Sequence, residues 1–114
     1  MTMKITAKTT LSDIASAFAQ AFPYLKLAFF MRQRGKWVEA EQNAAPLSTS
    51  ASEILLNLDP ERTVKDLLSE LQSLLQLEVM ILRRSGRLYI ETSVTEDWTL
   101  QRQNDEGAEL SQTY

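Results

Sequence analysis

The sequence contains no cysteine and no histidine. Without cysteine the chain has no disulfide framework, no thiolate metal site and no thiol nucleophile. Without histidine it lacks the side chain that most often exchanges protons near neutral pH. Catalysis would have to depend on carboxylates, lysine or tyrosine. We therefore expect a protein that is not an enzyme and that holds no cofactor or metal.

Glycine and long apolar runs are also scarce. The three glycines, Gly35, Gly86 and Gly107, are too far apart to form a glycine-rich phosphate loop. The longest uninterrupted apolar run covers residues 27–31, whereas a membrane helix needs about 20 residues. The first residues contain no apolar stretch of signal-peptide length. These absences predict a soluble cytoplasmic protein that does not contact a membrane.

What is present is enough for one folded domain. The chain has 114 residues, of which 44% are hydrophobic, and a formal net charge of -3. A chain of this length normally forms one domain, and its acidity makes nucleic acid an unfavourable partner overall. Few apolar residues follow residue 104. We therefore predict a single α+β domain over 1–104 and a flexible tail over 105–114.

Two segments have the apolar spacing of amphipathic helices. Residues 10–22 and residues 63–76 each begin with a threonine, whose hydroxyl can accept a hydrogen bond from the first helical turn. Apolar side chains then recur every three or four residues. Pro23 ends the first segment, because proline disfavours a helical conformation in the residue before it.

Five further segments are expected to form strands. They cover residues 3–7, 25–32, 54–58, 78–84 and 87–92, and Trp37 begins one more strand after a turn at Arg34-Gly35. Residues 42–52 read as a loop. Ser50 and Glu53 also match a capping box, so residues 54–58 have a helical alternative. Their short length and the following Asp59-Pro60 turn favour a strand.

The resulting order is β-α-β-β, repeated once. It predicts an antiparallel sheet with two helices packed on one face. Residues 10–22 and 63–75 share three identities, Thr, Asp and Ser, so a duplicated β-α-β-β unit and coincidence both remain open. In element order and acidity, residues 10–100 resemble the small dimeric secretion chaperones, a resemblance of fold alone that depends on the strand at 54–58. A ferredoxin-like α/β sandwich with an extra strand is equally compatible.

The last hairpin suggests an interaction surface. A two-residue turn at Ser85-Gly86 would place Leu82 opposite Tyr89 and Arg84 opposite Arg87. One face would then supply core residues, which are Val79, Ile81, Leu88 and Ile90. The other face would carry Met80, Leu82 and Tyr89, although the open face of a lone sheet is usually polar. We therefore predict a twofold homodimer or another protein partner on this face, with Met80, Leu82, Tyr89 and Trp98 as candidate interaction residues. The alternative is a monomer in which Trp98 and Leu100 cover the face.

The two expected hairpin turns are rich in basic residues. Six of the twelve lysines and arginines fall in residues 32–36 and 83–87, namely Arg32, Arg34, Lys36, Arg83, Arg84 and Arg87. These side chains are candidates for binding phosphate, nucleic acid or an acidic segment, although charged turns also serve solubility alone.

Protein interaction or self-association is the function that the sequence favours. A nucleic-acid or phosphate binder would need the two basic turns to lie together in space. A small-molecule sensor would need an apolar cavity between the sheet and the helices. Large aromatic residues in a small domain are usually buried in the core, and we expect this of Trp37 under each of the three functions.

Overall fold

The structure is a computed structural model that describes residues 2–43 and 53–112. Its elements confirm the predicted order and add a third helix. In chain order they are β1 (Thr2–Ile5), α1 (Leu11–Ala21), β2 (Leu25–Gln33), β3 (Lys36–Glu39), β4 (Ile54–Asn57), α2 (Val64–Leu75), β5 (Glu78–Ser85), β6 (Leu88–Glu91), the short 3-10 helix η1 (Ser93–Thr95) and α3 (Leu100–Gln112). Residues 54–57 form a strand, as predicted. Most of the expected loop over 42–52 lies outside the described residues.

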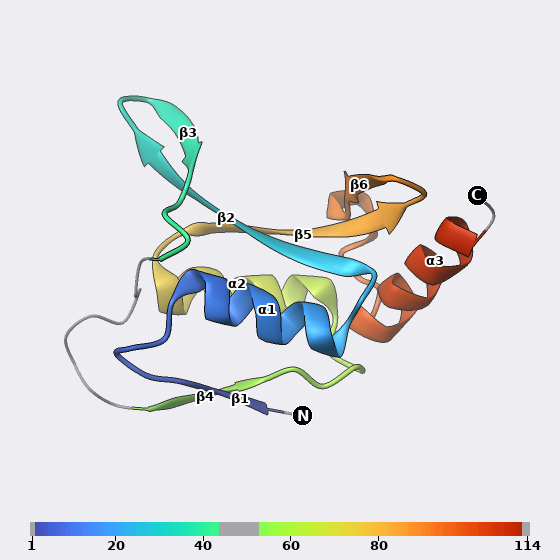
Figure 1. Ribbon diagram of the computed structural model, residues 1–114, viewed down its shortest axis with the longest axis horizontal. Helices are drawn as coiled ribbons and strands as arrows, with labels where there is room; N and C mark the ends of the chain where they lie inside the picture. The colour runs from blue at the N-terminus through green and yellow to red at the C-terminus, as the bar shows by residue number, and fades with distance from the viewer. Residues whose placement is uncertain (1, 44–52, 113–114) are drawn as a thin grey trace.

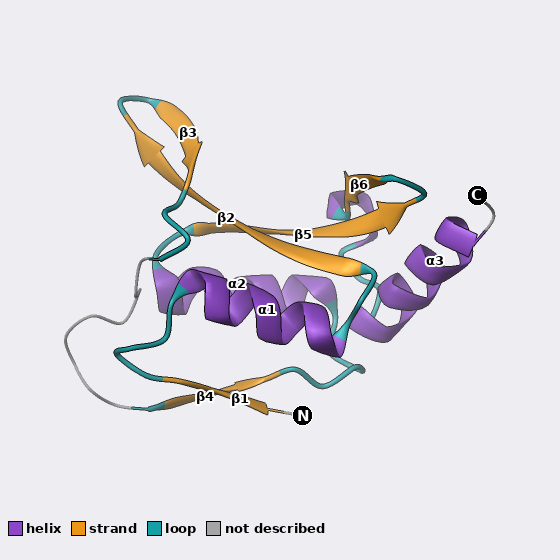
Figure 2. Cartoon of the chain, viewed as in Figure 1, coloured by secondary structure: helices purple, strands orange, loops and turns teal. Residues whose placement is uncertain are grey.

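The elements form three layers (Figure 1). One sheet has the strand order β3-β2-β5-β6, the other contains β1 and β4, and every pair is antiparallel. Helices α1 and α2 lie between the two sheets (Figure 2). The α+β fold with two helices on one face of an antiparallel sheet is therefore present. In the described residues no helix is long and apolar enough to cross a membrane.

The second sheet is the main departure from the predicted architecture. The strands β1 and β4 pair with each other, from Thr2 opposite Asn57 to Ile5 opposite Ile54, instead of joining the larger sheet. Ile5 and Leu56 are completely buried, so this small sheet closes the side of the helices that a single sheet would leave exposed. A ferredoxin-like sandwich, with its single sheet, is not the arrangement found. The two halves share their element order, but nothing positive in the structure indicates duplication.

Both helices begin where the threonines predicted. The hydroxyl of Thr10 accepts a hydrogen bond from the backbone N–H of Asp13 at 3.1 Å, and the Asp13 carboxylate accepts one from the N–H of Thr10 at 2.9 Å. Thr63 accepts from the N–H of Asp66 at 3.1 Å. Such caps satisfy N–H groups that have no partner within the helix. The apolar stripes that follow are buried, with Leu11, Ile14, Phe18, Val64, Leu67 and Leu71 among the core residues.

The hairpin between β5 and β6 has a different register from the predicted one. Ser85 pairs with Leu88, Arg84 with Tyr89 and Leu82 with Glu91. The turn residues are therefore Gly86 and Arg87, not Ser85 and Gly86. Gly86 has φ +64° at the first central position, as in a type II′ turn, where glycine is favoured. The predicted pairs of Leu82 with Tyr89 and of Arg84 with Arg87 were wrong.

The register moves by two positions, so each side chain keeps its predicted side of the sheet. Even so, Leu88 and Ile90 are exposed, although we expected them in the core with Val79 and Ile81. The reason lies in the position of β6, which is the outermost strand on its side of the sheet. Val79 and Ile81 lie on β5, which contacts α2, and both are buried.

Helix α3 replaces much of the expected flexible tail. Residues 105–112 belong to this helix, and residues 113–114 lie outside the described part of the chain. Its anchors are largely polar, so the scarcity of apolar residues after residue 104 does not prevent the helix from packing. The completely buried side chain of Gln103 donates hydrogen bonds to the carbonyl and hydroxyl oxygens of Thr95, at 2.9 and 2.6 Å, and accepts one from Arg83 at 3.0 Å. The Asn104 side chain accepts a hydrogen bond from the N–H of Tyr24 at 2.9 Å.

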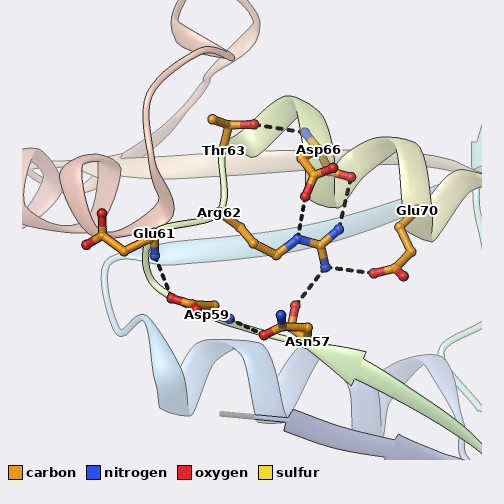
Figure 3. A network of polar contacts seen from close by, with 7 residues as sticks. All are labelled: Asn57, Asp59, Glu61, Arg62, Thr63, Asp66 and Glu70. Atoms are coloured by element: carbon orange, nitrogen blue, oxygen red, sulfur yellow. Dashed lines mark hydrogen bonds and ion pairs between the residues drawn. The ribbon is translucent and has the colours of Figure 1, made fainter.

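Arg62 joins the end of β4 to helix α2 (Figure 3). Its Nε and Nη1 lie 2.7 Å from carboxylate oxygens of Asp66 and Glu70, and Nη1 also donates to the carbonyl of Asn57 at 2.8 Å. The Arg62 side chain is only 13% exposed. Burial lowers the pKa of its guanidinium, but hydrogen bonds with Glu70 and Asp66 and their charges raise it by more. The pKa lies above the ordinary value, and the group stays charged.

Replacing Arg62 by methionine is expected to lower the free energy of unfolding by about 1–2 kcal/mol, because the Asn57 carbonyl and two carboxylates lose a shared donor. Urea denaturation measures this loss. Part of it should disappear at high salt, which screens the exposed Asp66 carboxylate. Lys65→Met removes an exposed cation from the same helix and should change stability little. Equal losses in the two variants would mean that the network of Arg62 is not stabilising.

Candidate interaction surface

The larger sheet has one face toward the helices and one face away from them. Strand alternation sends Leu25, Leu27 and Phe29 inward, where all three are buried. The residues between them point outward. We call the side away from the helices the outer face, and its members are Lys26, Ala28, Phe30, Arg32, Trp37, Glu39, Glu78, Met80, Leu82, Arg84, Tyr89 and Glu91.

The outer face is apolar at its centre and aromatic at two opposite ends. Ala28 lies opposite Met80 on the two central strands. Trp37 on β3 is 54% exposed and Tyr89 on β6 is 45% exposed. The β2–β3 hairpin and the β5–β6 hairpin rise at opposite ends of this face, and no helix or strand of the described chain lies over it (Figure 1). Large apolar side chains are therefore left in contact with solvent.

A hollow of about 360 Å³ opens on this face. It is lined by Phe30, Trp37, Glu78 and Met80, three apolar side chains and one carboxylate. Pockets of this kind accept large apolar side chains from a partner. The hollow opens to solvent, whereas a sensor domain was expected to enclose a cavity between sheet and helices.

Charges on the outer face are balanced. Three cations, Lys26, Arg32 and Arg84, accompany three carboxylates, Glu39, Glu78 and Glu91. Two of the cations lie near the aromatic rings, with Lys26 Nζ 5.5 Å from the Tyr89 ring centre and Arg32 5.4 Å from that of Trp37. These distances allow a cation–π attraction. The basic residues therefore help to hold the aromatic side chains in place.

The basic turns do not form one anion site. Arg34 and Lys36 belong to the hairpin at one end of the sheet and Arg87 to the hairpin at the other end (Figure 1). Arg84 donates a hydrogen bond to the carbonyl of Gly86 within its own turn, at 2.9 Å. Arg83 points to the inner side, where it bonds Gln103. The six candidate anion-binding residues are thus divided among three locations.

Trp98 lies away from the other candidate interaction residues. Its ring is flanked by Arg102 at 3.8 Å and Arg83 at 5.7 Å from the ring centre. Its carbonyl accepts a hydrogen bond from the N–H of Val64 at 3.0 Å, and the neighbouring Leu100 is completely buried. The expected alternative, in which Trp98 and Leu100 cover the outer face, is not the arrangement found. Met80, Leu82 and Tyr89 do lie together on that face.

Sequence reasoning missed Phe30 and Trp37 as members of this surface. Trp37 was expected in the core because large aromatic residues in small domains are usually buried. The sequence of the first hairpin indicates where Trp37 lies. A two-residue turn at Arg34-Gly35 places Trp37 opposite Arg32, as the structure has it. Because side chains alternate along a strand, Arg32 points to the side opposite Leu27 and Phe29, which is outward, and Trp37 points the same way.

Comparison of the chain with protein-family models, with curated proteins and with solved structures finds no significant match. Among residues 2–43 and 53–112, no group of three or more acidic side chains is placed to hold a metal ion.

Proposed function

We propose that this protein is a non-enzymatic self-association domain that forms a twofold homodimer through its outer face. The observation that carries the proposal is the exposed apolar surface between Trp37 and Tyr89 on the side of the sheet that the helices leave bare. Exposed apolar patches with polar surroundings are typical of protein–protein contact sites. A cytoplasmic location, expected from the sequence, is part of this proposal.

The charge pattern favours a second copy over a strongly charged partner. In a twofold dimer the same surface is present on both sides of the interface. A face with three cations and three carboxylates can pair with itself, because each sign finds its opposite. Nucleic acid would instead meet the carboxylates of Glu39, Glu78 and Glu91, which repel phosphate. The alternatives of nucleic-acid binding and small-molecule sensing therefore have less support.

Apolar burial can offset part of the cost of association. Fully burying a side chain such as Leu82 or Tyr89 contributes about 1.5–3 kcal/mol, and a twofold contact buries each of them twice. Association costs about 4–15 kcal/mol in translational and rotational freedom. Because Leu82 is already partly buried in one chain, a stable dimer must also bury Phe30, Trp37 and Met80.

Tyr89→Glu is expected to shift the dimer to the monomer without unfolding it, because it places a carboxylate in the apolar contact beside Glu91. Light scattering on a sizing column measures the mass, and circular dichroism checks the fold. Leu55→Glu is the matched control, since Leu55 is 64% exposed but lies on β4, in the other sheet. It should leave the dimer intact. A mass of one chain at every concentration of the unmodified protein would refute the proposal.

A further inference from the structure

One edge of the central strand β2 is open beside helix α1. Strand β3 pairs with β2 from Phe30 to Gln33, and the last bond on this side runs from the N–H of Ala40 to the carbonyl of Phe29 at 2.9 Å. The first part of β2, residues 25–28, pairs with β5 on its other side. On the β3 side it has no strand neighbour among the described residues. In the part of the chain that the structure describes, four residues of sheet edge therefore have no partner strand.

Leu27 directs its backbone toward this open edge. Successive residues of an antiparallel strand direct their N–H and C=O groups to opposite sides. Phe29 bonds toward the β3 side, so Leu27, two residues earlier, does the same. Within residues 2–43 and 53–112, no strand register or hydrogen bond occupies the outward N–H and C=O groups of Leu27. An unpaired edge of this kind is a template for another strand.

A groove follows the open edge. Its volume is about 610 Å³. One wall comes from helix α1 and consists of short side chains, which are Ser12, Ala15, Ser16 and Ala19. The opposite wall includes Lys26 and Tyr89 of the sheet. An extended chain that bonds to Leu27 would lie in this groove.

The edge of β5 along residues 78–81 is closed by side chains, unlike the open edge of β2. There Gln72 Nε2 donates to the carbonyl of Val79 at 3.2 Å, and the Thr92 hydroxyl donates to the carbonyl of Ile81 at 2.7 Å. The space beside that edge is about 280 Å³. Gln72 follows the capping Thr63 of α2 by the same number of residues as Ala19 follows the capping Thr10 of α1. The two residues therefore hold equivalent positions in their helices. The methyl side chain of alanine cannot donate a hydrogen bond to the strand.

We propose that the open edge of β2 binds an extended segment of another protein as an added strand. Main-chain hydrogen bonds to Leu27 would provide affinity, and alternate side chains would enter the groove beside α1. The short side chains of α1 leave room for groups of the size of alanine or serine. Lys26 and Glu39 are the only charged residues among the groove's lining residues, one of each sign. The preferred segment is therefore uncharged.

A second copy of this chain does not fit the same edge. Strand β3 occupies the same side of β2 from Phe30 onward, and Ala40 bonds Phe29. If two β2 strands paired antiparallel through residues 25–28, Tyr24 of one copy would meet Ala40 of the other. Tyr24 continues the line of β2 because its carbonyl accepts a hydrogen bond from the N–H of Arg84. The occupant must instead be a chain that continues the line of β3 and then leaves the sheet. This requirement is met by a peptide segment with no hairpin of its own.

The proposed peptide site goes beyond self-association and is separable from it. Six outer-face residues also line the groove, namely Lys26, Ala28, Phe30, Glu39, Leu82 and Tyr89. Trp37, in contrast, belongs to the outer face and not to the groove. Trp37→Glu should therefore weaken the dimer and leave peptide binding unchanged. Loss of one property without the other shows which proposal has failed.

The test uses an acetylated and amidated peptide of sequence Thr-Ala-Val-Ala-Thr-Ala-Val and nuclear magnetic resonance of the full chain. We expect the peptide to shift the amide signals of residues 25–28 and to slow hydrogen exchange at Leu27. The same peptide with alternate amides N-methylated lacks the donors for pairing and should not bind. Ala19→Gln, which introduces the side chain that closes the β5 edge, should weaken binding by up to about tenfold, the loss of about one hydrogen bond.

Ala7→Gln is the control, since Ala7 is exposed and does not line the groove. It should bind as the unmodified protein does. The proposal is overturned if the peptide fails to bind, if its N-methylated form binds equally well, or if Ala19→Gln binds as tightly as Ala7→Gln. Signal shifts confined to residues outside β2 and α1 would overturn it too.

Discussion

Leu71→Ala is expected to lower the free energy of unfolding by about 2–5 kcal/mol. Leu71 is completely buried in α2, the helix that lies between the two sheets. Removing its side chain leaves a cavity in the hydrophobic core, which the packed neighbouring residues fill only in part. Chemical denaturation monitored by tryptophan fluorescence measures the loss.

Ser73→Ala is the matched control on the same helix, because Ser73 is exposed. It should change the unfolding midpoint by little, since alanine favours a helix slightly more than serine does. If both variants unfold at the midpoint of the unmodified protein, Leu71 contributes nothing to the core and the three-layer arrangement needs revision.

Gly107→Leu is expected to destabilise the protein by about 3 kcal/mol, at the upper end of the usual cost of overpacking. A Cβ atom at Gly107 would lie 2.9 Å from Cβ of Tyr24 and 3.2 Å from its carbonyl oxygen. Both atoms belong to or adjoin the backbone at the start of β2 and cannot move aside alone. Helix propensity predicts the opposite sign, because leucine favours a helix over glycine by almost 1 kcal/mol. The sign of the change in melting temperature separates the two effects.

Glu109→Leu is the control for Gly107→Leu, since Glu109 is exposed on the same helix. It should leave the melting temperature nearly unchanged. A stabilised Gly107→Leu variant would mean that α3 does not contact β2, and that residues 105–112 contribute no more than the flexible tail predicted from the sequence.

The helices and most strands could be predicted because their determinants are local. Thr10 and Thr63 cap helices whose apolar spacing is regular, and Pro23 ends the first of them. The strand at 54–57 was predicted for its length and for the turn at Asp59-Pro60. Which strands pair is not a local property. The sequence contains nothing that assigns β1 to β4 instead of to the larger sheet.

The hairpin register and helix α3 were missed for different reasons. The pattern Ser85-Gly86-Arg87 permits two turns, and the preference of glycine for the first central position decides between them. Helix α3 has no continuous apolar stripe, and its contact depends on a buried amide at Gln103 and on the missing side chain of Gly107. One signal was present, because Thr99 precedes the helix and accepts a hydrogen bond from the N–H of Arg102 at 3.1 Å.

The interaction surface was predicted in part. Met80, Leu82 and Tyr89 were assigned to the same face, because a register error of two positions leaves the alternation of side chains unchanged. Trp98 was wrongly added to them, since its position depends on α3. The open edge of β2 could not be found at all. It depends on how far β3 extends along β2, which no periodicity in either segment specifies.

The central pair of the larger sheet joins β2 from the first half of the chain to β5 from the second half, with Leu25 opposite Arg83. The smaller sheet joins β1 to β4. During synthesis on the ribosome, the smaller sheet can therefore form only after Asn57 has emerged, and the larger sheet can be completed only after Glu91. The first half must wait with the hydrophobic face of β2 incompletely covered, in a state open to aggregation or to chaperones. Pairings this distant in the sequence also predict slow folding, on the scale of milliseconds or longer.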